Sequence, residues 1–149
     1  MDQPQIEILI LANHVEAVNG LLYISGGGWT DHWRPAPQGG QPVVSHLGVG
    51  VTVLVPWTAS QAVHTLAVAI EDTGGRQVAS VSAQLNPTRP QGLPTGSDQR
   101  AVLALSLNLV FPGPGEYRLV ARLDQGEART VGFRVHDVTQ PHADPPAIN

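Results

Sequence analysis

Hydrophobic and polar residues alternate along most of this chain, with the period of two that is typical of a β-strand with one buried face. The clearest case is the segment 100–111, in which every second residue from Leu103 to Phe111 is leucine or phenylalanine. A helix would spread these side chains around its circumference, whereas a strand places them all on one side. The segment is therefore predicted to be a strand.

Similar patterns predict about eight strands in all, at residues 6–11, 21–25, 43–55, 62–71, 76–85, 100–111, 117–123 and 130–135. Glycine-rich polar segments such as Asn19-Gly20, 72–75 and 124–127 are expected to form the turns between them. Residues 12–19 are expected to form a loop or a short helical turn, and residues 29–42 a long loop without regular structure.

These elements indicate an all-β fold, an antiparallel β-sandwich of the immunoglobulin-like, Greek-key type, with a small closed β-barrel as the alternative. Three successive strands between residues 43 and 85 suggest a meander. The proline-containing segment 86–99 is expected to cross from one sheet to the other. We expect a single domain over residues 1–138 and a disordered, Pro-rich tail over residues 139–149.

The composition excludes several classes of function. The absence of cysteine rules out disulfides, thiolate metal sites and cysteine nucleophiles. Eight basic and twelve acidic residues give a net charge of −4, and there is no lysine, so we expect neither nucleic acid nor a membrane as a partner. The N-terminus does not have the pattern of a signal peptide and no apolar run is long enough to span a bilayer, so we expect a cytoplasmic protein.

Two motifs carry a resemblance to a known family. Residues 20–29 fit G-x-L-x-I-x-G-G-G-W, and residues 112–117 fit P-x-P-G-x-Y. With the opening strand, they resemble a family of small uncharacterised bacterial proteins, mostly actinobacterial, of unknown function. The resemblance implies a β-sandwich and no particular chemistry. The second motif is also similar to a turn in immunoglobulin-like sandwiches, in which a tyrosine, here Tyr117, packs across a corner and bonds to the backbone through its hydroxyl.

The sequence contains no recognisable catalytic motif, and we predict no catalytic residues, metal or cofactor. Gly26-Gly27-Gly28 lacks the helix and the Lys-Ser/Thr ending of a phosphate-binding loop, so it is expected to be a strand end or bulge that requires positive φ. No two histidines have a metal-ligand spacing, although a site built from Asp31, His32 and a distant partner is an alternative. Four arginines on the last two strands are expected to form a solvated cationic stripe: Arg118, Arg122, Arg129 and Arg134.

The best candidate for ligand or partner binding is the group Trp29, Asp31, His32 and Trp33. Two tryptophans in a polar, proline-rich segment provide large apolar surfaces of the kind that stack on sugar rings or anchor a protein partner. In the competing interpretation, one or both fold back and close an open end of the sandwich.

The function that we predict from these residues is a non-catalytic binding or protein-interaction module for a protein or carbohydrate ligand. The alternatives are a small enzyme or ligand carrier with its site at the same loop, and a structural subunit of a larger assembly, in which the chain could form a homo-oligomer.

Overall fold

The structure, a computed structural model, describes residues 3–138. Within this range, one short 3-10 helix, η1 (Trp57–Ala59), accompanies nine strands: β1 (Gln5–Val18), β2 (Leu21–Gly27), β3 (Asp31–Pro35), β4 (Ser45–Val55), β5 (His64–Asp72), β6 (Gln77–Leu85), β7 (Gln99–Leu109), β8 (Gly115–Leu123) and β9 (Ala128–Val138).

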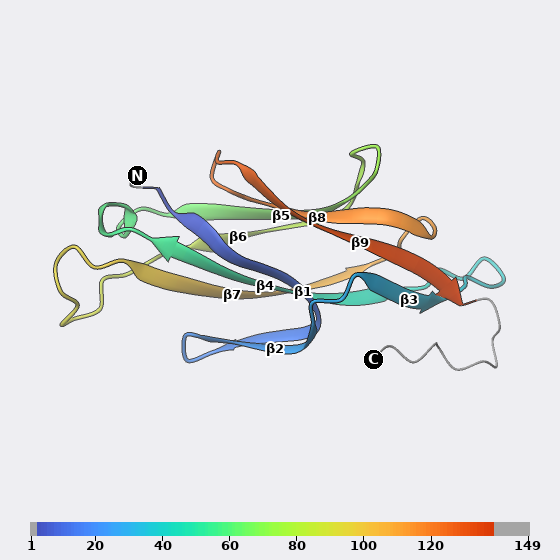
Figure 1. Cartoon of the computed structure of the whole chain (residues 1–149), viewed down its shortest axis with the longest axis horizontal. Coiled ribbons are helices and arrows are strands. Elements are labelled where there is room, and N and C mark those ends of the chain that lie inside the picture. The colour runs from blue at the N-terminus through green and yellow to red at the C-terminus, as the bar shows by residue number, and fades with distance from the viewer. Residues whose placement is uncertain (1–2, 139–149) are drawn as a thin grey trace.

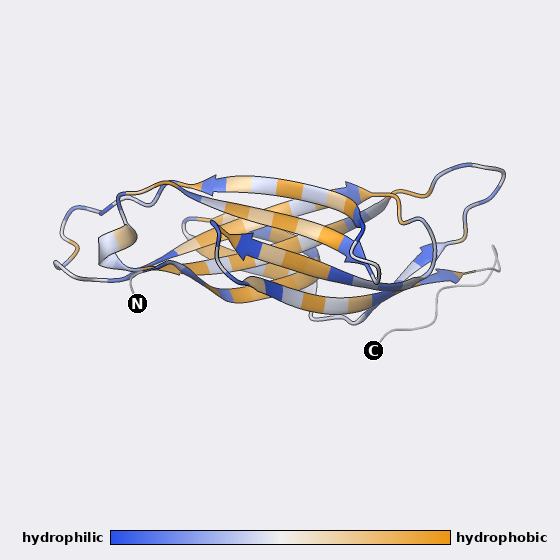
Figure 2. Ribbon diagram, turned by 90° about the horizontal axis from the view of Figure 1, so that it is seen from above, coloured by the Kyte–Doolittle hydropathy of each residue, from blue (hydrophilic) through white to orange (hydrophobic). Residues whose placement is uncertain are grey.

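The strands form two sheets that pack face to face, which confirms the predicted β-sandwich (Figure 1). One sheet has the order β2-β1-β4-β7 and the other the order β3-β9-β8-β5-β6. All pairs are antiparallel except β3 and β9, which are parallel. Apolar residues recur along the central strands of both sheets (Figure 2), and their inward side chains form one continuous core.

The connections between strands match the sequence analysis in two places and contradict it in one. The segment between β6 and β7 crosses from one sheet to the other, and β5 and β6 form a hairpin, as predicted. The predicted meander is wrong because β4 and β5 belong to different sheets. Helix η1 lies between them, and the alternating apolar residues of β4 and β5 therefore meet across the core as two opposed layers.

Two segments predicted to lack strands contain them. Residues 12–18 continue β1 instead of forming a loop or helical turn, and Val15 in this stretch is only 4% exposed. Asn19 and Gly20 then adopt φ values of 51° and 75°, which close a two-residue hairpin onto β2. In the predicted long loop, Asp31–Pro35 forms β3. Its partner β9 lies about a hundred residues away, so no local pattern marks the pairing.

Residues 5–12 of β1 pair with β4, whereas residues 12–18 pair with β2, which lies below the rest of the four-stranded sheet in Figure 1. Two glycines of β4 let the β1–β2 hairpin approach closely. A Cβ atom added at Gly48 would lie 3.1 Å from the Val15 backbone nitrogen, and one added at Gly50 would lie 3.1 Å from a Leu22 methyl carbon. In β4 the valines therefore fill the core on the inner face, and the glycines between them allow the hairpin to approach the outer face.

Both sequence motifs have structural roles in the sandwich. The Tyr117 hydroxyl donates a 2.7 Å hydrogen bond to the Gly113 carbonyl, and the ring centroids of Tyr117 and Phe111 are 4.8 Å apart. These contacts confirm the predicted corner. Gly26 and Gly28 have φ values of 64° and 83°, in the region that favours glycine. The glycine run is thus required by the backbone at the end of β2.

Candidate functional site

Strand β3 divides the predicted binding group between the two faces of the five-stranded sheet. Successive side chains of a strand point to opposite faces, so Asp31 and Trp33 lie on the outer face and His32 on the inner one. Trp29, just before the strand, also packs inward. The four residues therefore do not form one platform, and their role in binding stays a prediction.

The inner pair belongs to the border of the core. The Trp29 ring meets Phe133 edge-on, with centroids 5.7 Å apart and planes at 84°, and packs against the hydrophobic core. His32 lies 5.7 Å from Trp29, and its Nε2 is 3.1 Å from the Ser45 Oγ. Burial, followed by the charge of Arg34, lowers the pKa of His32 and favours the neutral ring. Trp29 thus occupies the place expected of a residue that closes the sandwich.

The proposed enzymatic use of Asp31 and His32 loses its geometric basis in this arrangement. Their side chains lie on opposite faces, so they cannot act on one substrate or bind one metal ion. Ser45, the hydroxyl nearest to His32, is only 4% exposed. Within residues 3–138, no three histidine or carboxylate side chains converge as a metal site requires.

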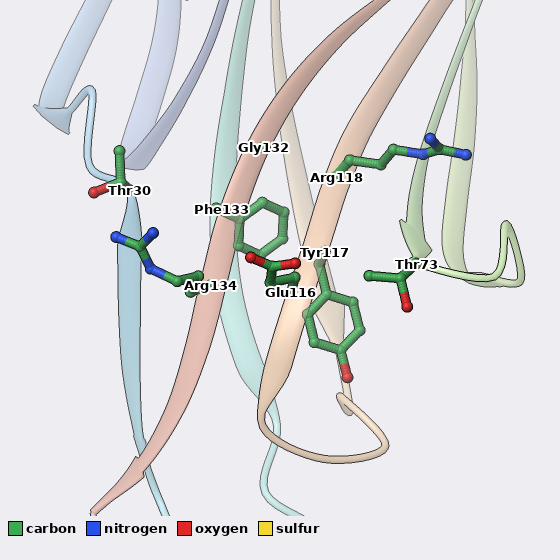
Figure 3. A pocket seen from close by; sticks show the side chains of 8 residues that line it. All are labelled: Thr30, Thr73, Glu116, Tyr117, Arg118, Gly132, Phe133 and Arg134. Atoms are coloured by element: carbon green, nitrogen blue, oxygen red, sulfur yellow. The ribbon is translucent and has the colours of Figure 1, made fainter.

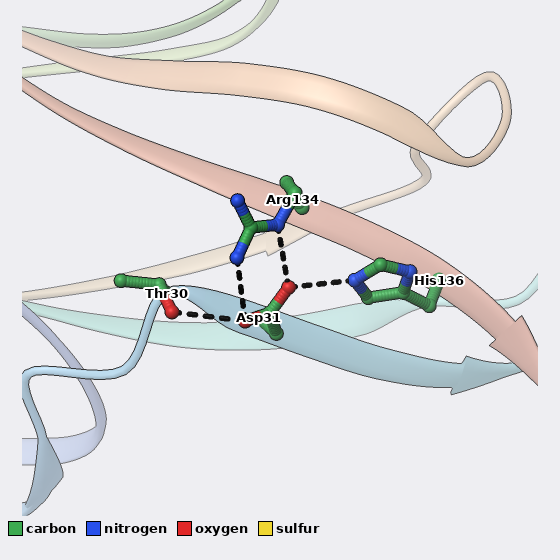
Figure 4. Close-up of polar contacts among 4 residues, drawn as sticks. All are labelled: Thr30, Asp31, Arg134 and His136. Carbon is green, nitrogen blue, oxygen red and sulfur yellow. Dashed lines mark hydrogen bonds and ion pairs between the residues drawn. The ribbon is translucent and has the colours of Figure 1, made fainter.

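On the outer face, Asp31 is the centre of a polar cluster (Figure 4). Its two carboxylate oxygens accept hydrogen bonds from Arg134 Nε and Nη2 at 2.7 and 3.0 Å. Thr30 Oγ1 donates at 2.9 Å, and His136 Nε2 lies 2.7 Å from the same carboxylate. These bonds, that from Arg134 first, hold the pKa of Asp31 well below its usual range. The carboxylate is therefore charged at all ordinary pH values.

Trp33 extends this cluster along the sheet. Its ring stacks on His136 with centroids 4.4 Å apart and an angle of 24° between planes. Because His136 also contacts Asp31, the indole is tied to the same group of side chains. We call Asp31, Trp33, Arg134 and His136 the outer cluster.

Beside the outer cluster lies a groove of about 430 Å³ over β8 and β9 (Figure 3). Its polar walls come from β8, β9 and the ends of neighbouring strands, and its lining residues are Thr30, Thr73, Glu116, Tyr117, Arg118, Gly132, Phe133 and Arg134. Tyr117 and Phe133 are buried core residues, so the groove is a hollow in the outer face of the sheet.

Gly132 lines the hollow without a side chain. It lies inside β9 directly opposite Arg118, and its φ is outside the left-handed region, so its backbone does not require glycine. A Cβ atom added there would meet nothing within 4 Å. Glycine weakens a strand interior and often marks a place where a ligand or another backbone approaches closely. We call this hollow the Gly132 groove.

The arginines predicted to form a cationic stripe are mostly engaged in other contacts. Arg118 bonds to Glu71 at 2.9 Å and Arg134 to Asp31, so acidic partners offset both charges at the groove. Arg122 donates to the Gly126 carbonyl, and Arg129 donates to the Ile6 carbonyl on the opposite sheet. The outer face therefore presents a mixture of donors and acceptors with little excess of positive charge.

The sequence points to Asp31 and Trp33 as binding candidates, but it assigns Arg134 to a cationic stripe and does not place His136 or Gly132 near them. One signal was available. Residues 31–34 read D-x-x-R and residues 134–137 read R-x-x-D, and the parallel register places Asp31 opposite Arg134 and Arg34 opposite Asp137. The complementary charges at the same spacing in the two segments could therefore have predicted that β3 pairs with β9.

Comparison with known proteins gives a family and no activity. A family model described as a family of unknown function, DUF6941, matches residues 7–136, and the chain belongs to this family. No curated protein matches the sequence. In the part of the chain that the structure describes, no helix has the length and apolar character needed to cross a membrane.

Proposed function

We propose that this member of a family of unknown function is a non-catalytic binding module, and that it binds a saccharide on the outer face of its five-stranded sheet. The observation that carries the proposal is Gly132, a glycine inside a strand that neither the backbone nor the packing requires. It lines the groove, and a larger residue at this position would project into it.

The chemistry of the groove suits a polar ligand without strong net charge. Thr30 and Thr73 supply hydroxyls, and Glu116 supplies an acceptor. Arg118 and Arg134 use Nε and Nη2 in their ion pairs, so Nη1 of each can donate to a ligand. Sugar hydroxyls donate and accept hydrogen bonds, so this mixture matches them better than it matches an anion.

Trp33 provides an apolar surface on the same face. It stacks on His136, which lies four residues along β9 from Gly132, a distance of about 13 Å at 3.3 Å per residue. An oligosaccharide that begins in the Gly132 groove would reach the indole, which could stack on a sugar ring. We infer that short saccharides use the groove alone and longer ones use both. The bacterial origin and cytoplasmic location expected from the sequence belong to the same proposal.

The test is a glycan array followed by calorimetric titration of the best binder. Gly132→Val should fill the groove with a residue that suits a strand and should weaken binding at least tenfold. Thr130→Val is the matched control, because it introduces the same side chain one exposed position away on β9, outside the groove. Trp33→Ala should weaken binding of long saccharides more than that of short ones. Binding by Gly132→Val as tight as that of the wild type, or no glycan binder at all, would overturn the proposal.

A further inference from the structure

The β1–β2 hairpin gathers exposed large apolar residues around its turn. Eight large apolar residues within residues 3–138 are at least 40% exposed, and four of them belong to the hairpin: Val18 at 43%, Leu21 at 58%, Tyr23 at 53% and Ile24 at 40%. Isolated exposed apolar residues are common, but Val18, Leu21 and Tyr23 share one face of the hairpin, and Ile24 lies on the other face of the same strand. A contiguous apolar group of this kind marks an interaction surface. The hairpin lies on the opposite sheet from the Gly132 groove, so any partner here is distinct from the proposed ligand.

Strand β2 is also an open edge of its sheet. Its other side pairs with β1, and residues 21–27 contain no proline and no charged residue. Natural proteins usually protect such an edge with charges or proline. Strand β3 has Asp31, Arg34 and Pro35, and β7 has Arg100, which bonds to Glu7. The fourth edge, β6, is charge-free but exposes mainly serine and glutamine. Only β2, among these four, combines an open ladder with exposed apolar side chains.

We propose that β2 pairs antiparallel with β2 of a second copy of this chain about a two-fold axis, which joins the two four-stranded sheets into one continuous sheet. About a two-fold axis the central residue of the strand faces its own copy, so an edge with a charge at its centre would repel itself. Strand β2 has no such charge. The chain's own C-terminal segment is a poorer occupant because 139–149 contains Pro141, Pro145 and Pro146, which cannot donate to a ladder.

The hairpin also limits the registers that this pairing can adopt. In a two-residue hairpin, the residues that flank the turn exchange both backbone bonds, and every second pair does the same. Leu21 and Tyr23 therefore direct their backbone groups to β1, while Leu22 and Ile24 direct theirs to the free edge. Among the two-fold registers that use these groups, we choose the one that places Leu22 opposite Ile24 of the other copy and Tyr23 opposite its own equivalent, because it is centred on the apolar residues of the strand. Seven residues make a small interface, so we expect a concentration-dependent equilibrium between monomer and dimer.

Sedimentation velocity over a hundredfold range of concentration tests the proposal. The wild-type chain should shift towards dimer as its concentration rises. Tyr23→Lys should weaken the dimer at least tenfold, because two lysines then face each other at the axis, and Tyr23→Glu should do the same. An equimolar mixture of the two variants should recover dimer. Val63→Lys, at a residue that is 58% exposed but remote from β2 in the chain, is the matched control and should dimerise like the wild type.

Circular dichroism of each variant confirms that its sheets form, so that a loss of dimer reports on the interface. A wild-type chain that stays monomeric throughout the range overturns the proposal. A Tyr23→Lys variant that dimerises normally, or a mixture that recovers no dimer, overturns the two-fold pairing of β2.

Discussion

The two faces of β3 carry two ion pairs of the same kind in very different surroundings. On the inner face, Arg34 donates to Asp137 at 2.6 Å and to the Phe111 carbonyl at 2.8 Å, and its side chain is 2% exposed. On the outer face, Asp31 accepts from Arg134, whose side chain is 52% exposed. Both pairs join residues directly opposite in the parallel ladder. They fix the same register, but only the outer pair is accessible to a ligand.

Burial, and not residue type, separates a structural ion pair from one that a ligand can use. A buried charge that loses its partner is costly, whereas an exposed pair contributes little to stability because water and salt screen it. We therefore expect the inner pair to determine whether β3 docks at all. The outer pair should matter mainly for what the face binds.

The largest effect is expected at the inner pair. Arg34→Met should lower the free energy of unfolding by about 3–5 kcal/mol, because Asp137 would remain partly buried without a partner. The measurement is urea denaturation followed by circular dichroism. Arg34→Met combined with Asp137→Leu should recover part of the loss, since no charge is then stranded. A double variant less stable than the single one would contradict the charge explanation.

A second buried cluster should make stability depend on pH. His64 Nδ1 lies 2.8 Å from an Asp124 carboxylate oxygen and its Nε2 lies 2.8 Å from the Ala59 carbonyl oxygen. Burial alone would lower the pKa of His64, but the bonds to Ala59 and Asp124 outweigh burial and raise it above 6.5. Only the protonated ring donates to both acceptors.

The folded state therefore holds this proton more tightly than the unfolded state does. The contribution of His64 is fully present below the unfolded pKa of about 6.5, and it is lost as the pH rises through the folded value. His64→Gln should lower the free energy of unfolding by about 1–3 kcal/mol at pH 6 and by less at pH 9. Urea denaturation across that range checks this, and parallel profiles for the two proteins would exclude His64 as the cause.

A smaller effect is expected at the tyrosine corner. Tyr117→Phe removes the hydrogen bond to the Gly113 carbonyl and leaves the ring in place, so the free energy of unfolding should fall by about 1 kcal/mol. Tyr23→Phe is the matched control, because Tyr23 is 53% exposed on the hairpin, and it should leave stability unchanged. Thermal unfolding of both variants gives the comparison. Equal losses at the two positions would contradict a specific role for the corner.

The smallest effect on stability is expected on the outer face. Asp31→Asn leaves Arg134 exposed to water, so the unfolding curve should move little compared with that of Arg34→Met. The same variant should weaken binding of the saccharide found in the array, because Arg134 and His136 lose the group that positions them. A large loss of stability in Asp31→Asn would remove the distinction between the two faces.

Most of the strands were predictable because their information is local. The alternation in β7, from Leu103 onward, defines a strand whatever its neighbours are. The prediction of strands was wrong where pairing with another strand, and not the local sequence pattern, determined the structure. The polar residues His14 and Glu16 led to the prediction of a loop at residues 12–19. They are in fact exposed positions of β1 where it pairs with β2. The prolines near β3 indicate a loop, and only the distant ladder with β9 makes the segment a strand.

The candidate site was predictable only in part, for the same reason. Trp33 and Asp31 stand out in the sequence because of their residue types, but the same criterion selected Trp29 and His32, which point inward. Gly132 is one of sixteen glycines, and although the alternation around it predicts a strand, nothing in the sequence shows that its face of the strand borders a groove. Its place in the groove becomes visible only in the structure, where it lies opposite Arg118 with open space above it.

The sequence by itself determined the fold class, the turns and the tyrosine corner, because alternation, turn residues and a local hydrogen bond each act over a few neighbouring positions. Only the tertiary structure decided which sheet each strand joins, which face of β3 is buried and where the groove lies. These depend on contacts between residues as far apart as Asp31 and Arg134, and the free energy of such contacts is shared among distant strands rather than encoded in any one of them.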